Sequence, residues 1–240
     1  MNKAILTGRK LKSRVLDLLK SIDPDQGLEE LVKLPPRRVV NPLFSYLMHG
    51  DQEIRWRTIT AIGMVVANLA KSDMEAARVL VRRLMWSLNE ESGGVGWGAP
   101  EALGEIMACH EGLAKEYVHI MISYIMEDVN FVENEWLQRG VIWGLGRLAQ
   151  ARPSLLKDRV HYLYPYLQSG DALIRGLAAW AVGLLCGEGA LSILEDILSD
   201  DREIQIYLNR KMIMCRVSDL ARDAIAAIHK KEDPLKPGLR

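Results

Sequence analysis

The 240-residue chain has little phenylalanine, few cysteines and no excess of either charge, and these deficits exclude several classes of protein. Its three cysteines form no CxxC pair, so the sequence supports neither a disulfide framework nor a zinc ribbon. No apolar run approaches the roughly 18–20 residues that span a bilayer. The basic start lacks the apolar core and cleavage site of a secretory signal. These absences predict a cytoplasmic chain that does not enter a membrane.

Motifs for catalysis and metal binding are also missing. The five histidines lack paired metal-ligand spacing, and no GxSxG motif is present. The glycine-rich stretch SGGVGWGAP (92–100) is not followed by GK[ST], which excludes a P-loop. It is either a lengthened turn with Pro100 near the first helical position, or a loop that places Trp97 over a binding face. We predict no metal and no cofactor.

The net charge of the whole chain is zero, but acidic and basic residues are unevenly distributed along the sequence. The 31 Lys and Arg residues equal the 31 Asp and Glu residues, so no global basic field attracts nucleic acid. Residues 90–135 nevertheless contain ten acidic residues and one basic residue, a net charge of −9. Phosphate contacts dominate nucleic-acid affinity, so this segment argues against a nucleic-acid partner without excluding one. It suits a protein partner that carries Lys or Arg.

A repeated helical pattern dominates the chain. Apolar residues recur with the helical period, and alternating strand patterns are absent. Four segments share a glycine at their eighth position: WRTITAIGMV (56–65), WGAPEALGEI (97–106), RGVIWGLGRL (139–148) and GLAAWAVGLL (176–185). The glycines, Gly63, Gly104, Gly146 and Gly183, are separated by 41, 42 and 37 residues. A fifth copy, at 218–228, has alanine instead.

An apolar helix and a polar turn precede each copy. We expect a turn residue to accept hydrogen bonds from the free N–H groups of the following helix. These turn residues are Asp51, Asn89, Asp128, Asp171 and Asp201. Small residues inside the second helix should let neighbouring repeats approach closely. One first helix, LYPYL, is predicted to be a packed helix bent at Pro165.

A helix, a polar turn and a second helix at a spacing near 40 residues resemble the HEAT-like repeat family over roughly residues 40–230. The resemblance implies an all-α fold, a right-handed α-solenoid of about five helical-hairpin repeats. We expect residues 1–36 to form N-terminal capping helices that end at the LPP sequence. Residues 37–231 would then be the repeat domain, and residues 232–240 a polar tail.

Tryptophan is unusually frequent, with six residues against two phenylalanines. In the shared frame, the first, fifth and ninth positions lie on one face of each second helix, and four tryptophans occupy them. In HEAT-like stacks these helices line the concave surface, so we predict a Trp-rich binding face for a protein segment. Its residues are Trp97, Glu101, Glu105, Glu135, Arg139, Trp143, Arg147 and Trp180.

The stripe also has a structural interpretation. The indoles would pack between repeats, and the glutamates of the second copy would pair with the arginines of the third. Glu135 and Arg139 are additionally spaced as i,i+4 partners on one helix.

A second resemblance makes an enzyme the alternative. Trp97 followed by Glu101, and WLQR at 136–139, resemble the HEAT-like alkylpurine DNA glycosylases. The resemblance implies Glu101 as a catalytic carboxylate near an oxocarbenium charge, Arg139 on the phosphates, and the indoles of Trp97 and Trp180 on the sugar and base. The chain has Glu where that family has Asp. We therefore predict a non-catalytic binding or scaffold module, with DNA glycosylase activity on alkylated purines as the alternative.

Overall fold

The computed structural model describes residues 8–88 and 96–232, with side chains as far as residue 230. The chain divides into two compact units, Met1–Leu113 and Ala114–Arg240. Most described residues are helical, which confirms the predicted class. No described helix is both long enough and apolar enough to cross a membrane.

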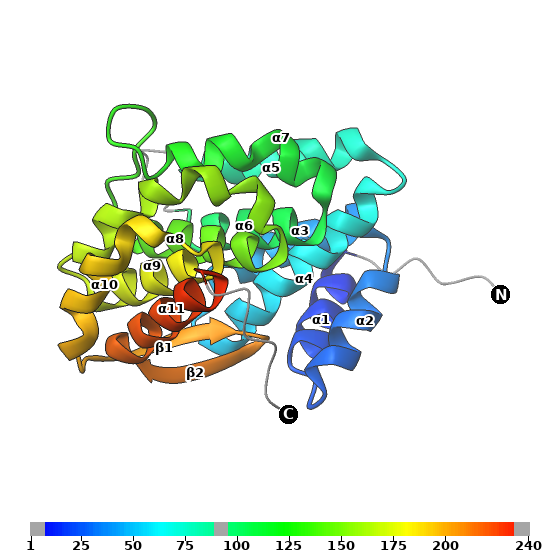
Figure 1. Ribbon diagram of the computed structural model, residues 1–240. Coiled ribbons are helices and arrows are strands. Elements are labelled where there is room, and N and C mark those ends of the chain that lie inside the picture. Colours follow the sequence, from blue (N-terminus) through cyan, green and yellow to red (C-terminus); the bar gives the residue numbers. More distant parts are fainter. Residues whose placement is uncertain (1–7, 89–95, 233–240) are drawn as a thin grey trace, which may run out of the picture. The chain divides into compact units, whose positions relative to one another are not determined.

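The first unit is built around one long central helix. Helix α4 packs against α2, α3, α5 and α6 and buries apolar residues on several faces, because small residues line much of its length. In the segment expected to form the cap, α1 and α2 contact each other (Figure 1). The helices are α1 (Gly8–Leu19), α2 (Pro24–Lys33), α3 (Pro36–Tyr46), α4 (Gln52–Ala70), α5 (Met74–Leu88) and α6 (Ala99–Cys109); α7 (Glu111–Ser123) crosses the division.

In the second unit, α9 is the central helix and packs against α8, η2 and α11. Three short 3₁₀ helices and a 12-residue one connect or precede the longer elements. The elements are α8 (Glu135–Ala151), η1 (Pro153–Leu155), η2 (Lys157–Gln168), α9 (Ala172–Leu185), η3 (Glu188–Ala190), α10 (Leu191–Asp196), η4 (Ile197–Ser199), β1 (Glu203–Leu208), β2 (Lys211–Arg216) and α11 (Val217–Glu232).

At two of the five predicted turns, the expected polar residue caps the second helix of the repeat. Asp51 accepts from the N–H groups of α4, and Asp171 accepts from those of α9. At α8 the cap is Asn134, so the prediction for Asp128 is wrong: Asp128 lies in a turn, and irregular residues separate that turn from the helix. Asp201 precedes a strand instead of a helix. Asn89 lies outside the described residues.

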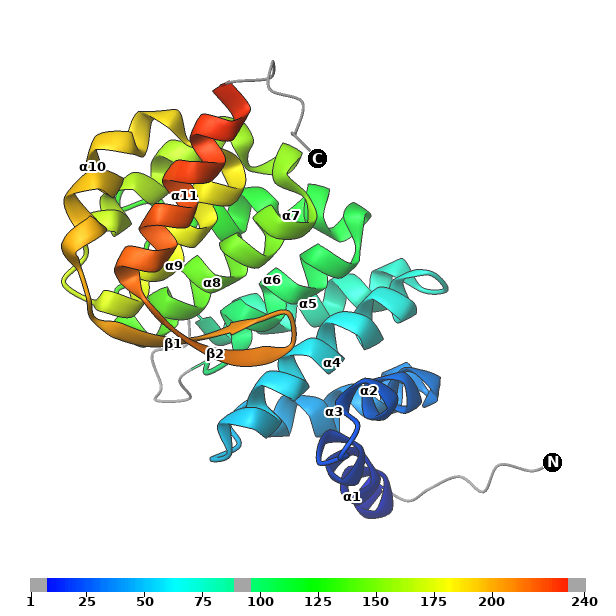
Figure 2. The same cartoon turned by 60° about the horizontal axis from the view of Figure 1, so that its bottom comes forward.

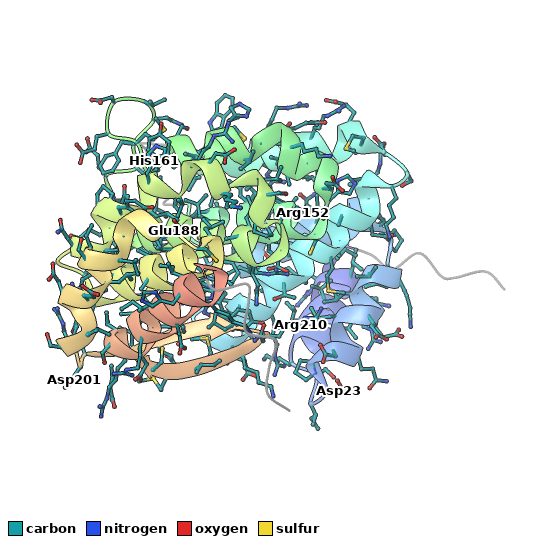
Figure 3. All side chains as sticks on the ribbon, in the orientation of Figure 1. Asp23, Arg152, His161, Glu188, Asp201 and Arg210 are labelled. Carbon is teal, nitrogen blue, oxygen red and sulfur yellow. The ribbon has the colours of Figure 1, made fainter. Side chains whose placement is uncertain are left out.

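The β1–β2 hairpin contradicts the prediction that strand patterns are absent. The first four residues of β1 alternate, so Ile204 and Ile206 are buried while Glu203 and Gln205 are exposed. Asn209 and Arg210 both have positive φ, which is the geometry of a two-residue hairpin turn. The hairpin runs beside α9 and α11 (Figure 2). Figure 3 places Asp201, before β1, and Arg210 at opposite ends of it.

Glycine allows neighbouring helices to approach closely at three of the four repeat positions. A Cβ at Gly63 would overlap Glu105 of α6. At Gly146 it would overlap the ring of Trp180, and at Gly183 it would overlap Ala224. The prediction that small residues bring successive second helices together is therefore confirmed at these positions.

Candidate functional site

The N-terminus of α6 holds the first group of predicted site residues. Trp97 is 37% exposed and directly precedes Gly98. Gly98 has a φ of 76°, a left-handed conformation that residues with a Cβ rarely adopt. Pro100 lies in the first helical turn, as predicted, where its missing N–H costs no helical hydrogen bond. The chain thus passes from an exposed indole into the helix within two residues. The rest of the glycine-rich stretch, 92–95, lies outside the described residues.

Glu101, at the third position of α6, has an unsatisfied carboxylate. Part of the residue surface is exposed, but Oε2 is fully covered and has no hydrogen-bond partner among the described residues. Burial raises the pKa of Glu101 to about 7, although its own backbone N–H and the charge of Arg55 on α4 act to lower it. A covered carboxylate oxygen without a donor is costly, and a cationic group that reaches it relieves that cost.

Glu105, one turn further along α6, is buried and serves packing. Its side chain lies against Gly63 of α4. The Sγ of Cys109 donates to its carboxylate at 3.5 Å. Glu105 is thus part of the contact between α4 and α6, and its expected place on an exposed stripe is wrong.

Arg139 links two helices of the second unit. Its Nε donates to Asp171 at 2.8 Å, and its guanidinium lies over the Trp136 ring at 4.2 Å. The i,i+4 pairing with Glu135, which is exposed on the first turn of α8, is not formed. Burial acts to raise the pKa of Asp171, but the N–H groups of α9 and the Arg139 charge outweigh it and lower that pKa. Arg139 therefore joins α8 to the cap of α9.

The two predicted site tryptophans of the second unit, Trp143 and Trp180, are packing residues in this structure. Trp143 is only 3% exposed, and its Nε1 donates to the Tyr207 carbonyl of β1 at 2.7 Å. The hairpin covers it, so its expected exposure is wrong. Trp180 is half-buried with its ring against Gly146. Arg147 is also half-buried. The packing of these indoles agrees with the structural interpretation of the stripe, but Arg139 pairs with Asp171 and not with a glutamate of the second copy.

A cavity in the second unit was missed from the sequence. It lies beside the LYPYL segment, which is part of a 3₁₀ helix and not the bent α-helix that was predicted. There the Tyr166 hydroxyl donates to the Ile125 carbonyl at 3.0 Å, across 41 residues of sequence. The sequence shows tyrosines in one segment and acidic residues in another. Because the two segments are far apart in the sequence, it does not show that they lie close together in the fold.

Comparisons with known proteins agree with this arrangement of helices. Residues 135–185 match the model of the HEAT-like repeat family. The chain has the fold of the HEAT-like repeat proteins. An uncharacterised protein of Archaeoglobus fulgidus is 25% identical over 183 residues, which is 74% of this chain and 91% of that protein.

Two solved structures extend the likeness of this HEAT-like repeat chain to most of its length. An engineered protein is 17% identical with a TM-score of 0.53, covering 92% of this chain and 96% of that one. A designed armadillo repeat protein in complex with the peptide (KR)4 is 15% identical with a TM-score of 0.52, covering 91% and 99%. At such identities, the likeness shows the fold alone.

Proposed function

We propose that this HEAT-like repeat chain is a non-catalytic binding module for a protein segment that carries lysine or arginine. The partner is received at the N-terminus of α6 by Trp97 and Glu101. One observation carries the proposal: Glu101 Oε2 is covered and has no donor among the described residues, four residues after the exposed Trp97. In such a module, this carboxylate oxygen can accept a hydrogen bond from the ligand.

Charge and ring chemistry support a cationic partner. An ammonium or guanidinium group supplies the donor that Oε2 lacks, and an indole face attracts the same cation. The net charge of −9 over residues 90–135 favours a basic segment in this region of the sequence. The designed armadillo protein of similar fold is in complex with a peptide of lysine and arginine, which supports the same class of partner.

The rest of the predicted stripe contributes less to this proposal. Trp143 and Glu105 are buried, and Arg139 is held by Asp171 and Trp136. The glycosylase alternative needs Arg139 to hold DNA phosphates, and this ion pair opposes that role. We therefore restrict the proposed contact residues to Trp97 and Glu101.

Binding of a fluorescein-labelled (KR)4 peptide to the full chain, followed by anisotropy, tests the proposal. We expect Glu101→Gln and Trp97→Ala each to weaken binding about tenfold, the equivalent of one lost charge-assisted hydrogen bond or cation–π contact. Two matched controls, Glu111→Gln and Trp86→Ala, remove the same groups from exposed positions elsewhere in the first unit. They should change the affinity less than twofold.

The pH dependence of binding gives a second readout. The peptide keeps its charge from pH 5.5 to 8, whereas Glu101 ionises within this range because its pKa is about 7. Affinity should therefore rise with pH in the wild type and stay flat in Glu101→Gln. Equal weakening in the control variants would contradict the proposal. Release of alkylated purines from DNA, lost in Glu101→Gln, would replace it with the enzyme alternative.

A further inference from the structure

A cavity of about 490 Å³ opens in the second unit between residues 125–131, α8 and η2. Aromatic side chains form much of its wall. The rings of His161 and Tyr162 lie 4.2 Å apart between centroids, and Phe131 and Tyr166 also line the cavity. Figure 3 labels His161 on η2, next to the loop that contributes Phe131. Flat aromatic walls of this kind favour a planar or cationic group.

Two carboxylates stand at the same cavity. Glu127 and Asp128 line it and are exposed, and neither forms an ion pair or side-chain hydrogen bond with any described residue. Burial, followed by the negative charge of Glu127, raises the pKa of Tyr166 to about 12. The field of Glu127 therefore reaches the cavity wall, and the cavity as a whole favours positive charge.

A third, independent feature points to a polar ligand. Gln138 of α8 lines the cavity and is only 9% exposed. Its backbone N–H donates to Asn134 at 2.9 Å, but its side-chain amide forms no hydrogen bond within the described part of the chain. The amide is not fully covered, so it can still form hydrogen bonds with a ligand that enters the cavity.

We propose that this cavity binds the guanidinium group of an arginine side chain from a protein partner. Guanidinium is planar, so it stacks on an aromatic face, and its five N–H donors match two carboxylates and the Gln138 carbonyl oxygen together. The ammonium group of lysine has its three donors on a single nitrogen, and it has no planar face to stack on an aromatic ring. The inference rests on the proposed function only in assigning the arginine to a protein, since none of the cavity residues belongs to the Trp97–Glu101 site.

Titration of the full chain with a blocked Gly-Gly-Arg-Gly-Gly peptide, followed by ¹H–¹⁵N NMR, tests the assignment. The side-chain amide resonances of Gln138 should shift, and the lysine analogue of the peptide should bind at least about fivefold more weakly. Gln138→Leu and Glu127→Gln should each weaken the arginine peptide about tenfold. Glu133→Gln is the matched control, because it removes an exposed carboxylate close in sequence that does not line the cavity.

Failure of this assignment is distinguishable from failure of the proposed function. Glu101→Gln should leave arginine-peptide binding here unchanged, whatever its effect on (KR)4 binding. Equal affinity for arginine and lysine, or unchanged binding in both Gln138→Leu and Glu127→Gln, would overturn the assignment. Should Gln138→Leu fail to fold, Glu127→Gln decides alone, because that residue is exposed and its substitution leaves the core intact.

Discussion

The N-termini of α9 and α6 use a carboxylate in opposite ways. At α9, Asp171 is the cap itself and accepts from the N–H groups of Leu173 and Ile174 while it holds Arg139. At α6, the cap is Gly98, which has no side chain, and the carboxylate of Glu101 lies three residues inside the helix. The first carboxylate is fully partnered, whereas the second retains a covered oxygen without a donor among the residues that the structure describes.

This difference of three positions explains the different pKa shifts of the two carboxylates. Helix N–H groups and a guanidinium stabilise the charged form of Asp171, so its pKa is lowered. Glu101 has little besides its own N–H and the more remote charge of Arg55, so burial dominates and its pKa is raised. A satisfied carboxylate is a structural element, while an unsatisfied one is available to a ligand.

The largest effect should come from breaking the satisfied cap. Asp171→Ala removes the cap and leaves the half-buried Arg139 without its carboxylate, so we expect a loss of about 3 kcal/mol in unfolding free energy. Asp51→Ala is the matched control, because Asp51 caps α4 through the same two backbone contacts without an arginine. That variant should lose about 1 kcal/mol. Urea denaturation measures both, and equal losses would show that the Arg139 pair adds nothing.

A smaller effect should appear as a pH dependence caused by Glu101. Its folded pKa of about 7 exceeds the ordinary value of 4.5, so the folded state binds more protons and stability falls as pH rises between these values. We expect a fall of about 2 kcal/mol, below the full shift because the residue is partly exposed.

Urea denaturation at pH 5 and pH 8 checks this prediction. Glu101→Gln should remove that part of the pH dependence, whereas Glu111→Gln, which changes the same group at an exposed position, should keep it. An unchanged slope in Glu101→Gln would show that Oε2 is already satisfied in solution, and the contrast with Asp171 would then disappear.

The smallest effect concerns the glycine at the α6 cap. Gly98→Ala places a Cβ in a left-handed conformation next to the Leu47 side chain, so it should cost about 1 kcal/mol. Gly170→Ala is the control, since Gly170 directly precedes the α9 cap and a Cβ there meets nothing within 4 Å. It should leave the melting temperature unchanged or slightly raised. Similar losses of stability in both variants would show that the left-handed conformation of Gly98 is not the cause.

Features that depend on near neighbours in the chain were predictable. The caps at Asp51 and Asp171, the helix break before Pro36 and the close approach at Gly146 all follow from local residue types. Gly98 and the exposure of Trp97 also follow from the glycines on both sides of the indole. The sequence therefore predicted that the candidate site lies at the N-terminus of α6. It did not predict whether the Glu101 carboxylate is hydrogen-bonded.

Other features were missed because distant segments determine them. The alternation in β1 covers only its first four residues, and it follows an acidic turn that resembles the helical turns elsewhere in the chain. Trp143 shared the repeated frame of the exposed Trp97, but the hairpin 64 residues later covers it. The cavity around Gln138 joins three segments that carry no common motif.

Residue types and their spacing along the chain were enough to predict the helical repeats, several of their caps and the glycines between them, because each depends on neighbouring residues. Which charged and aromatic groups have partners depends on the tertiary structure. Arg139 meets Asp171 32 residues away, and Trp143 meets Tyr207 64 residues away, whereas Glu101 Oε2 meets no donor among the described residues. Burial and hydrogen bonding depend on what the fold brings together, and a pattern along one helix does not contain that information.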